Sequence, residues 1–259
     1  MKLGFVGAGN MAGGLARGWA AATGEHGAPE SMAFADADPD KARTLAEEVG
    51  GDAVEGNLPL ADNVDLVVLA VKPNVLDEVA PDLVQAGTPV ISILAGTSLE
   101  MLHEALPGLD LIRVMPNLGA QLRQGVLCVV FSKGTDDARK RRISQLLGLV
   151  GEVIELDESL IDAATAIMGC TPGYLALMAE VLVEAGVKEG LTEDQTTRMV
   201  AKAMSATGGL LELQEPGALR RAVASSGGMT EAGLNALEER NIREILLAAV
   251  DASLDRVRK

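Results

Sequence analysis

The sequence predicts an α/β fold, with a doubly wound sheet in the N-terminal part of the chain and an all-α region after it. The first sign is a short apolar run, Leu3–Val6, that leads into a glycine-rich loop. Apolar runs of strand length then alternate with helical patterns as far as Leu156. From Asp157 onward the strand-like runs stop, and apolar residues recur at helical spacing. We therefore expect two domains, residues 1–157 and residues 158–259.

The glycine-rich loop has the pattern G-x-G-x-x-A, formed by Gly7, Gly9 and Ala12. Gly7 suits a tight turn from strand to helix, Gly9 lets the backbone approach a pyrophosphate, and Ala12 lets the helix pack close to the strand. A helix that begins at Asn10 and Met11 would direct free N–H groups and its positive end toward the phosphates. Loop glycines can also form an ordinary turn, but the strand before and the helix after favour a Rossmann-type dinucleotide site.

The second predicted strand, Met32–Ala35, ends at Asp36. A carboxylate at this position accepts hydrogen bonds from the adenosine ribose and repels the 2′-phosphate of NADP, so Asp36 favours NADH as the cofactor. Asp38 and Pro39 also suit the N-cap and the first residue of a helix over Asp40–Val49. Both roles can hold at once.

The central strands are predicted from continuous apolar runs, because parallel strands are buried on both faces. These runs are Asp65–Val71, Pro89–Leu94 and Leu111–Met115, and the runs Val126–Phe131 and Val153–Leu156 complete the sheet. Helices are expected over Leu99–Leu106, with Ser98 as its N-cap, and over Asp136–Leu149.

Loops at the carboxyl ends of parallel strands border the ligand crevice of such a sheet. We expect the crevice to be lined by Gly9, Ala70, Val71, Lys72, Pro73, Ala95, Gly96, Thr97, Pro116 and Asn117.

The C-terminal region is predicted to be a set of helices rich in Ala, Leu and Met. Expected helices span Glu158–Met168, Tyr174–Val187, Thr192 (as N-cap) to Leu213, Glu215–Ala224, Glu231–Glu239 and Ile242–Arg258, with an interruption at Gly169–Gly173. A single chain can hardly cover the apolar surface of these helices. We therefore expect a homodimer formed through this half of the chain.

Composition narrows the class of protein. The 259-residue chain has a net charge of −15, which argues against nucleic acid and anionic membranes as partners. No apolar run looks long enough to span a bilayer, and the N-terminus leads directly into a strand, so we expect a cytoplasmic protein that binds a small molecule. Cys128 and Cys170 are interpreted as reduced structural thiols, and the lack of Cys/His clusters predicts no metal site.

The donor groups available indicate the reaction. His26 and His103 lie in a loop and on a helix where neither suggests a catalytic acid or base. A protonated imine already carries its positive charge and can accept hydride without a strong general acid. The turn Ser225–Thr230 provides hydroxyl groups and glycines at the start of a helix, which suits a ring nitrogen and a carboxylate. An ordinary capped turn between helices is the alternative interpretation of that segment.

The segment Ala224–Leu234, ASSGGMTEAGL, followed by Leu237 and Glu238, resembles the signature of the pyrroline-5-carboxylate reductases. Four other segments agree with that family in order: Gly7–Ala12, Ala70–Pro73, Ile91–Gly96 with Arg113–Asn117, and Gly169–Tyr174 with Glu180 and Ala185–Val187. The resemblance implies NAD(P)H-dependent reduction of 1-pyrroline-5-carboxylate to proline. It also implies a helical domain that interleaves between two chains, often within a higher assembly.

The resemblance assigns roles to matching positions. Thr230 corresponds to the threonine that hydrogen-bonds the substrate nitrogen. Ser225 and the amides of Gly228, Met229 and Thr230 correspond to the carboxylate-binding turn. Asn57 corresponds to an asparagine that contacts the cofactor, and Lys72 and Pro73 to the loop near the nicotinamide.

The chain departs from the family pattern beside the expected pocket: Ser226 replaces a proline, Met168–Thr171 replaces a Ser-Gly-Ser-Gly motif, and Leu118-Gly119 replaces Thr-Pro. Two other functions stay open, besides another imine reductase on the same scaffold. A 3-hydroxyacid dehydrogenase shares this domain plan but needs a lysine one turn after the glycine motif, and Tyr174–Leu177 contains none. An NAD(P)-binding paralogue without activity is the second.

Overall fold

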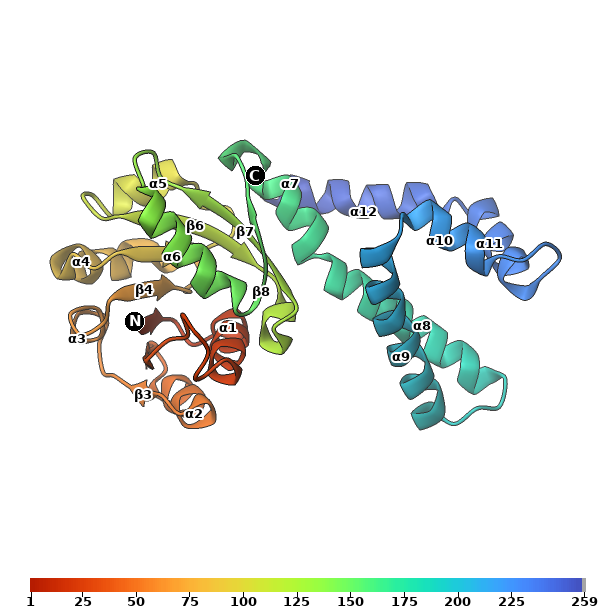
Figure 1. The fold of residues 1–259 in the computed structure, drawn as a ribbon, viewed down its shortest axis with the longest axis horizontal. Coiled ribbons are helices and arrows are strands. Elements are labelled where there is room, and N and C mark those ends of the chain that lie inside the picture. Colours follow the sequence, from red (N-terminus) through yellow and green to blue (C-terminus); the bar gives the residue numbers. More distant parts are fainter. Residues whose placement is uncertain (258–259) are drawn as a thin grey trace. The chain divides into compact units, whose positions relative to one another are not determined.

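The computed structural model describes residues 1–257 and divides into two compact units. The first unit covers Met1–Gly169 and contains the sheet, and the second covers Cys170–Arg256 and is helical (Figure 1). The predicted α/β fold followed by an all-α region is confirmed. The predicted boundary between residues 157 and 158 stays a prediction, and the predicted end of the last helix, Arg258, lies outside the described residues.

The sheet has eight strands in the order β3-β2-β1-β4-β5-β6-β7-β8. Their bounds are β1 Lys2–Val6, β2 Ser31–Ala35, β3 Asp52–Ala53, β4 Leu66–Leu69, β5 Val90–Ser92, β6 Leu111–Pro116, β7 Gly125–Phe131 and β8 Gly151–Glu155. The register aligns Phe5 of β1 with Phe34 of β2 and with Val68 of β4. The strand order reverses beside β1, which is where open α/β sheets bind ligands.

Strand β7 runs antiparallel to β6, while every other neighbouring pair in the described sheet is parallel. Only the short 3-10 turn Leu118–Leu122 connects β6 to β7. A parallel return needs a crossover of a dozen or more residues, so the short connection forces the antiparallel direction.

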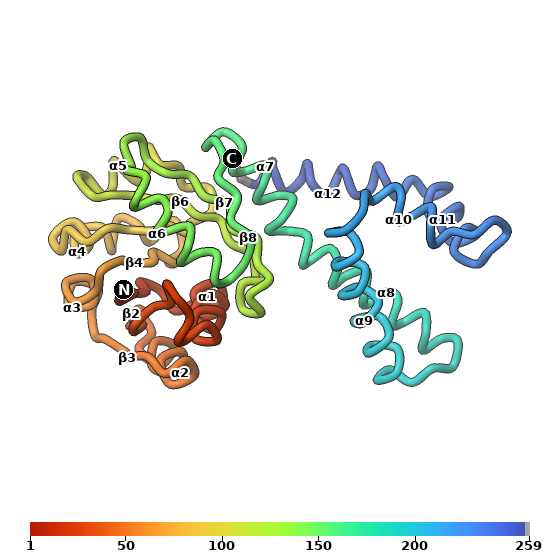
Figure 2. Tube along the Cα trace, in the orientation of Figure 1, coloured from red at the N-terminus to blue at the C-terminus, as the bar shows by residue number. Residues whose placement is uncertain are grey.

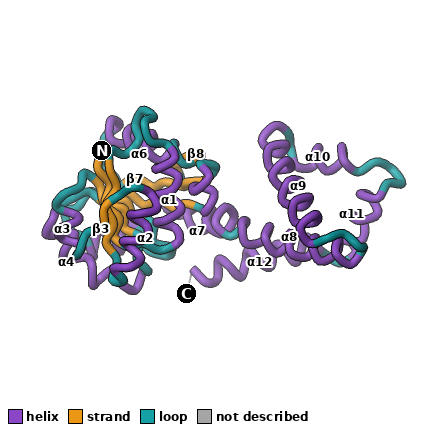
Figure 3. Tube along the Cα trace, turned by 90° about the horizontal axis from the view of Figure 1, so that it is seen from below, coloured by secondary structure: helices purple, strands orange, loops and turns teal. Residues whose placement is uncertain are grey.

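Helices cover both faces of the sheet, as Figure 3 shows. Their bounds are α1 Asn10–Ala21, α2 Pro39–Val49, α3 Asn57–Ala61, α4 Leu76–Ala86, α5 Leu99–Ala105 and α6 Asp137–Gly148. One buried cluster joins the sheet to α1, α2 and α6, and a second joins the opposite face to α3, α4 and α5. In the first cluster the ring of Phe5 stacks on Phe34 at 4.9 Å, and the indole N–H of Trp19 donates to the carbonyl of Leu146 at 2.8 Å.

Local signals predicted most of these elements. Asp38 accepts a hydrogen bond from the N–H of Asp40, and Ser98 from that of Met101, so both predicted N-caps are confirmed. Three elements, β3, α3 and α4, were not predicted from the sequence. Strand β3 has two residues and α3 has five, which is too short for a periodic pattern.

The second unit contains α8 Thr171–Lys188, α9 Glu193–Leu213, α10 Pro216–Val223 and α11 Met229–Glu239, with α12 Ile242–Val257 last (Figure 2). Helix α9 begins with a capping box in which the side chains of Thr192 and Gln195 each accept a backbone N–H of the other residue. Helices α8 and α9 pack together at Gly186, where an added Cβ would lie 2.4 Å from the methyl carbon of Thr196.

The predicted interruption at Gly169–Gly173 is smaller than expected. A 3-10 turn over Glu158–Leu160, helix α7 over Ile161–Ala164 and a π-helical turn over Thr165–Gly169 lead almost directly into α8. Pro172 is tolerated because it occupies the first turn of α8, where a backbone N–H has no intrahelical acceptor.

This near-continuous helix also corrects an expectation about the membrane. Glu158–Lys188 forms one helical stretch that is long and apolar enough, by length and composition, to cross a bilayer, and 6% of its most apolar window is buried. The glycines and the proline of 169–173 predict a break in the helix, so the stretch is not evident from the sequence alone. Helix α8 has no buried residue within the described chain, and its apolar side chains include Leu177 and Val181, which are 61% and 56% exposed.

Candidate active site

A cleft of about 490 Å³ lies at the carboxyl ends of the central strands in the α/β unit. It brings together six residues that the sequence assigned to the cofactor: Gly7, Gly9, Asp36, Asn57, Ala70 and Lys72. Its position at the end of β1, where the strand order reverses, is the usual place for a dinucleotide in such sheets.

The glycine loop has the backbone that its pattern predicted. Gly7 has a φ of +100°, and a Cβ there would lie 2.7 Å from the carbonyl oxygen of Ala70, so only glycine fits without strain. Gly9 is the N-cap of α1, and a Cβ built on it would meet nothing within 4 Å. Ala12 is 1% exposed and packs in the core. The loop therefore pairs a rigid turn with an open space above Gly9.

The start of α1 offers hydrogen-bond donors to that space. The first intrahelical bond runs from the N–H of Gly13 to the carbonyl of Gly9 at 2.9 Å. The N–H groups of Asn10, Met11 and Ala12 precede it and have no acceptor inside the helix. A phosphate beside Gly9 would meet these donors and the positive end of the helix.

Asp36 is half-buried at the end of β2 and is already engaged by the backbone. Its Oδ2 accepts the N–H of Ala8 at 2.7 Å, and its Oδ1 accepts the N–H of Asp38 at 2.9 Å. The carboxylate therefore fixes the glycine loop against β2. Each oxygen retains a second lone pair that can accept a hydroxyl.

Charged side chains lie close to Asp36 at this end of the cleft. The Oδ1 of Asp38 accepts the N–H of Asp40, and its Oδ2 lies 3.8 Å from the ammonium of Lys41. Lys41 lines the main cleft and also a second cleft of about 270 Å³ between α1 and α2. Arg43 pairs with Asp40, so Lys41 and Arg43 each lie beside a carboxylate.

The other predicted cofactor residues are not all in the main cleft. Pro73 and Gly96 line a separate cleft of about 370 Å³ together with Thr97 and Met101. Ala95 is exposed beside Gly96, which has a φ of +70°. Lys72 and Pro73 thus border different clefts although they are neighbours in sequence.

Sequence reasoning missed part of the lining. Val75, Glu78 and Val79 line the main cleft from the turn after β4 and from α4, and Gly56 lines it just before α3. The helix-ending Gly87 and the apolar spacing of Val79 and Leu83 were available signals for α4.

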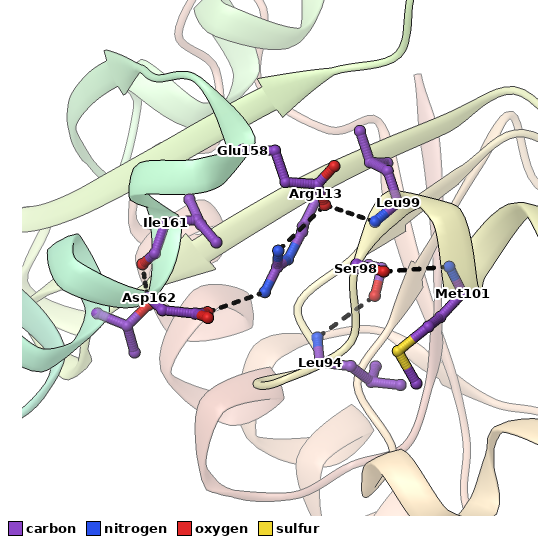
Figure 4. A network of polar contacts seen from close by, with 10 residues as sticks. Leu94, Ser98, Leu99, Met101, Arg113, Glu158, Ile161 and Asp162 are labelled. Atoms are coloured by element: carbon purple, nitrogen blue, oxygen red, sulfur yellow. Dashed lines mark hydrogen bonds and ion pairs between the residues drawn. The ribbon is translucent and has the colours of Figure 1, made fainter. Parts of the chain in front are cut away.

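A polar network that the sequence did not suggest lies beside the Gly96 loop (Figure 4). Arg113 on β6 has a side chain 4% exposed, and its guanidinium lies 3.1 Å from Oε1 of Glu158 and 3.5 Å from Oδ1 of Asp162. The same Glu158 Oε1 accepts the N–H of Leu99, the first residue of α5, at 2.5 Å. The single arginine inside the apolar strand 111–116 is the feature of the sequence from which buried partners could have been predicted.

The predicted substrate turn lies in the helical unit, between α10 and α11. Gly227 has a φ of +71° and donates its N–H to Oε2 of Glu231 at 2.7 Å. The N–H of Gly228 donates to the carbonyl of Ser225 at 2.9 Å, and a Cβ on Gly228 would lie 2.6 Å from the Ser225 hydroxyl. Gly228 is the N-cap of α11, so the N–H groups of Met229 and Thr230 have no acceptor inside the helix. Both of these residues are exposed.

A dinucleotide cleft in an α/β unit, together with a hydroxyl-bearing turn at the start of a helix, defines an NAD(P)-dependent oxidoreductase. Comparison with known proteins specifies the family. Residues 158–259 match the family model for pyrroline-5-carboxylate reductase dimerisation, and residues 2–96 match the model described as NADP oxidoreductase, coenzyme F420-dependent. A pyrroline-5-carboxylate reductase of Thermus thermophilus is 34% identical over 99% of this chain and 97% of its own. This chain belongs to the pyrroline-5-carboxylate reductase family, and the resemblance found in its motifs is confirmed.

Solved structures agree with this assignment. The Plasmodium falciparum pyrroline carboxylate reductase with NADP bound has a TM-score of 0.88 and 28% identity over 99% of this chain and 97% of its own. A 1-pyrroline-5-carboxylate reductase of Streptococcus pyogenes has a TM-score of 0.87 at the same identity, over 99% of this chain and 98% of its own.

The family match also accounts for the exposed helices. Most of the exposed large apolar side chains of the described chain lie between Leu175 and Leu247, inside the segment that matches the dimerisation model. An apolar surface of this extent is typical of an interface between subunits. The helical stretch Glu158–Lys188 falls in the same segment.

Proposed function

We propose that this protein reduces 1-pyrroline-5-carboxylate to proline, with hydride supplied by NAD(P)H. The observation that carries the proposal is the cleft at the end of β1, which gathers six predicted cofactor residues in a chain of the pyrroline-5-carboxylate reductase family. The cofactor supplies the hydride chemistry when it is bound, and the protein supplies binding and orientation.

The glycine loop and the start of α1 are proposed to hold the pyrophosphate. Gly7 and Ala12 shape the loop, Gly9 leaves the space, and Asn10 and Met11 donate backbone N–H groups. Asp36 and Asn57 are assigned to the adenosine side of the cleft. The nicotinamide side is assigned to Ala70, Lys72, Pro73, Ala95 and Gly96, which follow β4 and β5.

The turn Ser225–Thr230 is proposed to hold the substrate. The Thr230 hydroxyl hydrogen-bonds the ring nitrogen and keeps it protonated while the imine carbon accepts hydride. The exposed N–H groups of Met229 and Thr230, with the Ser225 hydroxyl, hold the carboxylate. Gly228 uses its own N–H inside the turn, so its contribution is to shape the turn where a side chain would not fit.

We infer a homodimer formed through the helical unit, in which this turn from one chain completes the site of the other. The support is the match to the dimerisation model and the apolar surface of α8, α9 and α12. The cytoplasmic location expected from the sequence stays a prediction, and so does any higher assembly.

NADH is the proposed cofactor of choice. Asp36 would lie beside the ribose 2′-position, and Asp38 and Asp40 add negative charge at the same edge. Lys41 and Arg43 each lie next to one of these carboxylates, which reduces their attraction for a 2′-phosphate.

The 3-hydroxyacid dehydrogenase alternative is not favoured. The first turns of α8 contain no lysine, which that chemistry needs at Tyr174–Leu177, and His103 is engaged with Ser132 at 3.2 Å in another part of the α/β unit. The lack of a suitable acid is tolerable only for an acceptor that is already protonated.

The proposal is tested by following the oxidation of NADH and NADPH with pyrroline-5-carboxylate as the acceptor. We expect turnover with both and a higher kcat/KM with NADH. Thr230→Ala should lower kcat/KM for the imine by about 100-fold, the usual effect of removing one preorganised hydrogen bond. Thr207→Ala is the matched control, because within the described residues the Thr207 hydroxyl donates to the Ala203 carbonyl of its own helix. No turnover with either cofactor would refute the proposal, and would leave an inactive dinucleotide-binding paralogue.

A further inference from the structure

We propose that Glu158, held by the buried Arg113, is a positioning residue that fixes the Ala95–Ser98 loop against the bound cofactor. The inference rests on the proposed function, because the loop is assigned to the nicotinamide side of the site. It assigns to the ion pair of Figure 4 a role in cofactor binding in addition to its contribution to stability.

Arg113 carries a buried positive charge. Its side chain is 4% exposed inside β6, so its charge needs carboxylate partners, and it has two in the structure. Glu158 is the nearer, at 3.1 Å, and Asp162 lies at 3.5 Å one helical turn further along the chain. Arg113 therefore holds the Glu158 carboxylate at a fixed place over the sheet.

Glu158 also contacts α5, the helix that follows the loop. One oxygen, Oε1, accepts both the Arg113 guanidinium and the N–H of Leu99. Ser98 caps the same helix by accepting the N–H of Met101. Leu99 would otherwise be one of the unsatisfied donors at the start of α5. Glu158 thus fixes the first residue after the loop.

Few hydrogen bonds hold the Ala95–Ser98 loop in the described part of the chain, although the Thr97 side chain is buried. Gly96 has a φ of +70°, and because glycine has no Cβ it restricts the backbone less than other residues do. Thr97 is 1% exposed, and its hydroxyl makes no hydrogen bond within the described part of the chain. Gly96 and Thr97 line the same cleft as Pro73. A small displacement of this loop would change the lining of the cleft and therefore its contacts with a bound cofactor.

Three variants test the inference, because both carboxylates pair with Arg113 but, of the two, Glu158 is the one that also accepts a backbone N–H of α5 in the described chain. Glu158→Ala removes the bond to Leu99 and one partner of Arg113. Asp162→Ala removes the other partner of Arg113 but no hydrogen bond to α5. Glu158→Gln keeps an oxygen that can accept the N–H of Leu99.

The readouts are the Kd for NADH from fluorescence titration, kcat and KM with pyrroline-5-carboxylate, and the hydrogen-exchange rate of the Leu99 amide. We expect Glu158→Ala to raise the Kd and the KM for NADH by about tenfold and to speed exchange at Leu99. Glu158→Gln should bring the Kd for NADH and the exchange rate at Leu99 most of the way back to the wild-type values. Asp162→Ala should change the Kd by less than about twofold, at a comparable loss of stability in urea.

Equal effects of Glu158→Ala and Asp162→Ala on the Kd would overturn the inference, since the ion pair would then act only through stability. Faster exchange at Leu99 with an unchanged Kd would also overturn it. If the wild-type protein binds NADH but does not reduce the imine, the proposed function fails while the Kd comparison still decides the inference.

Discussion

The side-chain amide of Asn117 donates a hydrogen bond of 3.0 Å to the carbonyl oxygen of Met168. Asn117 directly follows Pro116, the last residue of β6, and Met168 lies in the π-helical turn that leads toward α8. The other end of the Asn117 side chain accepts the N–H groups of Gly119 and Val126. One amide group therefore joins the strand end, the turn into β7 and the segment that precedes the helical unit.

Replacement of Asn117 should separate these contacts. Asn117→Asp keeps an acceptor for the two N–H groups but loses the donor to Met168, so we expect a loss of about 1 kcal/mol in the free energy of unfolding. Asn117→Leu removes all three bonds and leaves polar groups unpaired, so we expect about 2–4 kcal/mol. Urea unfolding followed by fluorescence of Trp19, the single tryptophan, measures both. Equal losses for the two variants would contradict this account of the side chain.

The two glycines of the phosphate loop should respond differently to substitution. Gly7→Ala places a Cβ 2.7 Å from the Ala70 carbonyl at a φ of +100°, so we expect a loss of about 1–3 kcal/mol in stability. Gly9→Ser meets open space and a favourable N-cap, so stability should be retained. The added side chain stands where the pyrophosphate is proposed to lie, so the Kd for NADH should rise by about tenfold or more. Retained NADH affinity in Gly9→Ser would place the phosphates elsewhere.

Cofactor choice should depend on two carboxylates in different ways. Asp36→Ser removes the charge proposed to repel the 2′-phosphate, and we expect the ratio of kcat/KM for NADH to that for NADPH to fall by roughly tenfold. Asp38→Ser keeps the N-cap but frees Lys41 to attract the 2′-phosphate, so the same ratio should fall. The expected fall is smaller, about fivefold, because the Lys41–Asp38 pair is exposed and therefore weak. The control is Lys41→Met in the Asp38→Ser background, which should reverse the gain for NADPH. A wild-type preference for NADPH would show that Asp36 does not select the cofactor.

The buried Cys128 thiol makes stability depend on pH at the alkaline end. Burial raises its pKa above the ordinary value of 9.0, because the thiolate would lose its hydration. A raised pKa in the folded state means that this contribution to stability is complete below pH 9 and is lost as the pH rises through the folded pKa. Cys128→Ala should therefore flatten the decline of stability above pH 9, measured by urea unfolding. An unchanged slope in the variant would assign the decline to other groups.

The patterns that are local in sequence predicted the fold and the backbone of the glycine loop. The glycine loop, the capping residues Asp38, Ser98 and Thr192, and the apolar runs each depend on neighbours within a few residues. The direction of β7 and the partners of Arg113 depend on residues far apart in the chain, so periodicity carried no information about them. The glycines and the proline of 169–173 predicted an interruption of the helix. The structure accommodates them with one π-helical turn and with the proline in the first turn of α8.

The exposed apolar helices have a consequence for how the protein holds its folded state. The described residues of α8 and α11 include none that a single chain buries, and α9 buries only Thr196. In the proposed dimer, the free energy of unfolding of this half therefore contains an association term. Mass action then makes its melting temperature rise with protein concentration, so dilution alone favours its unfolding.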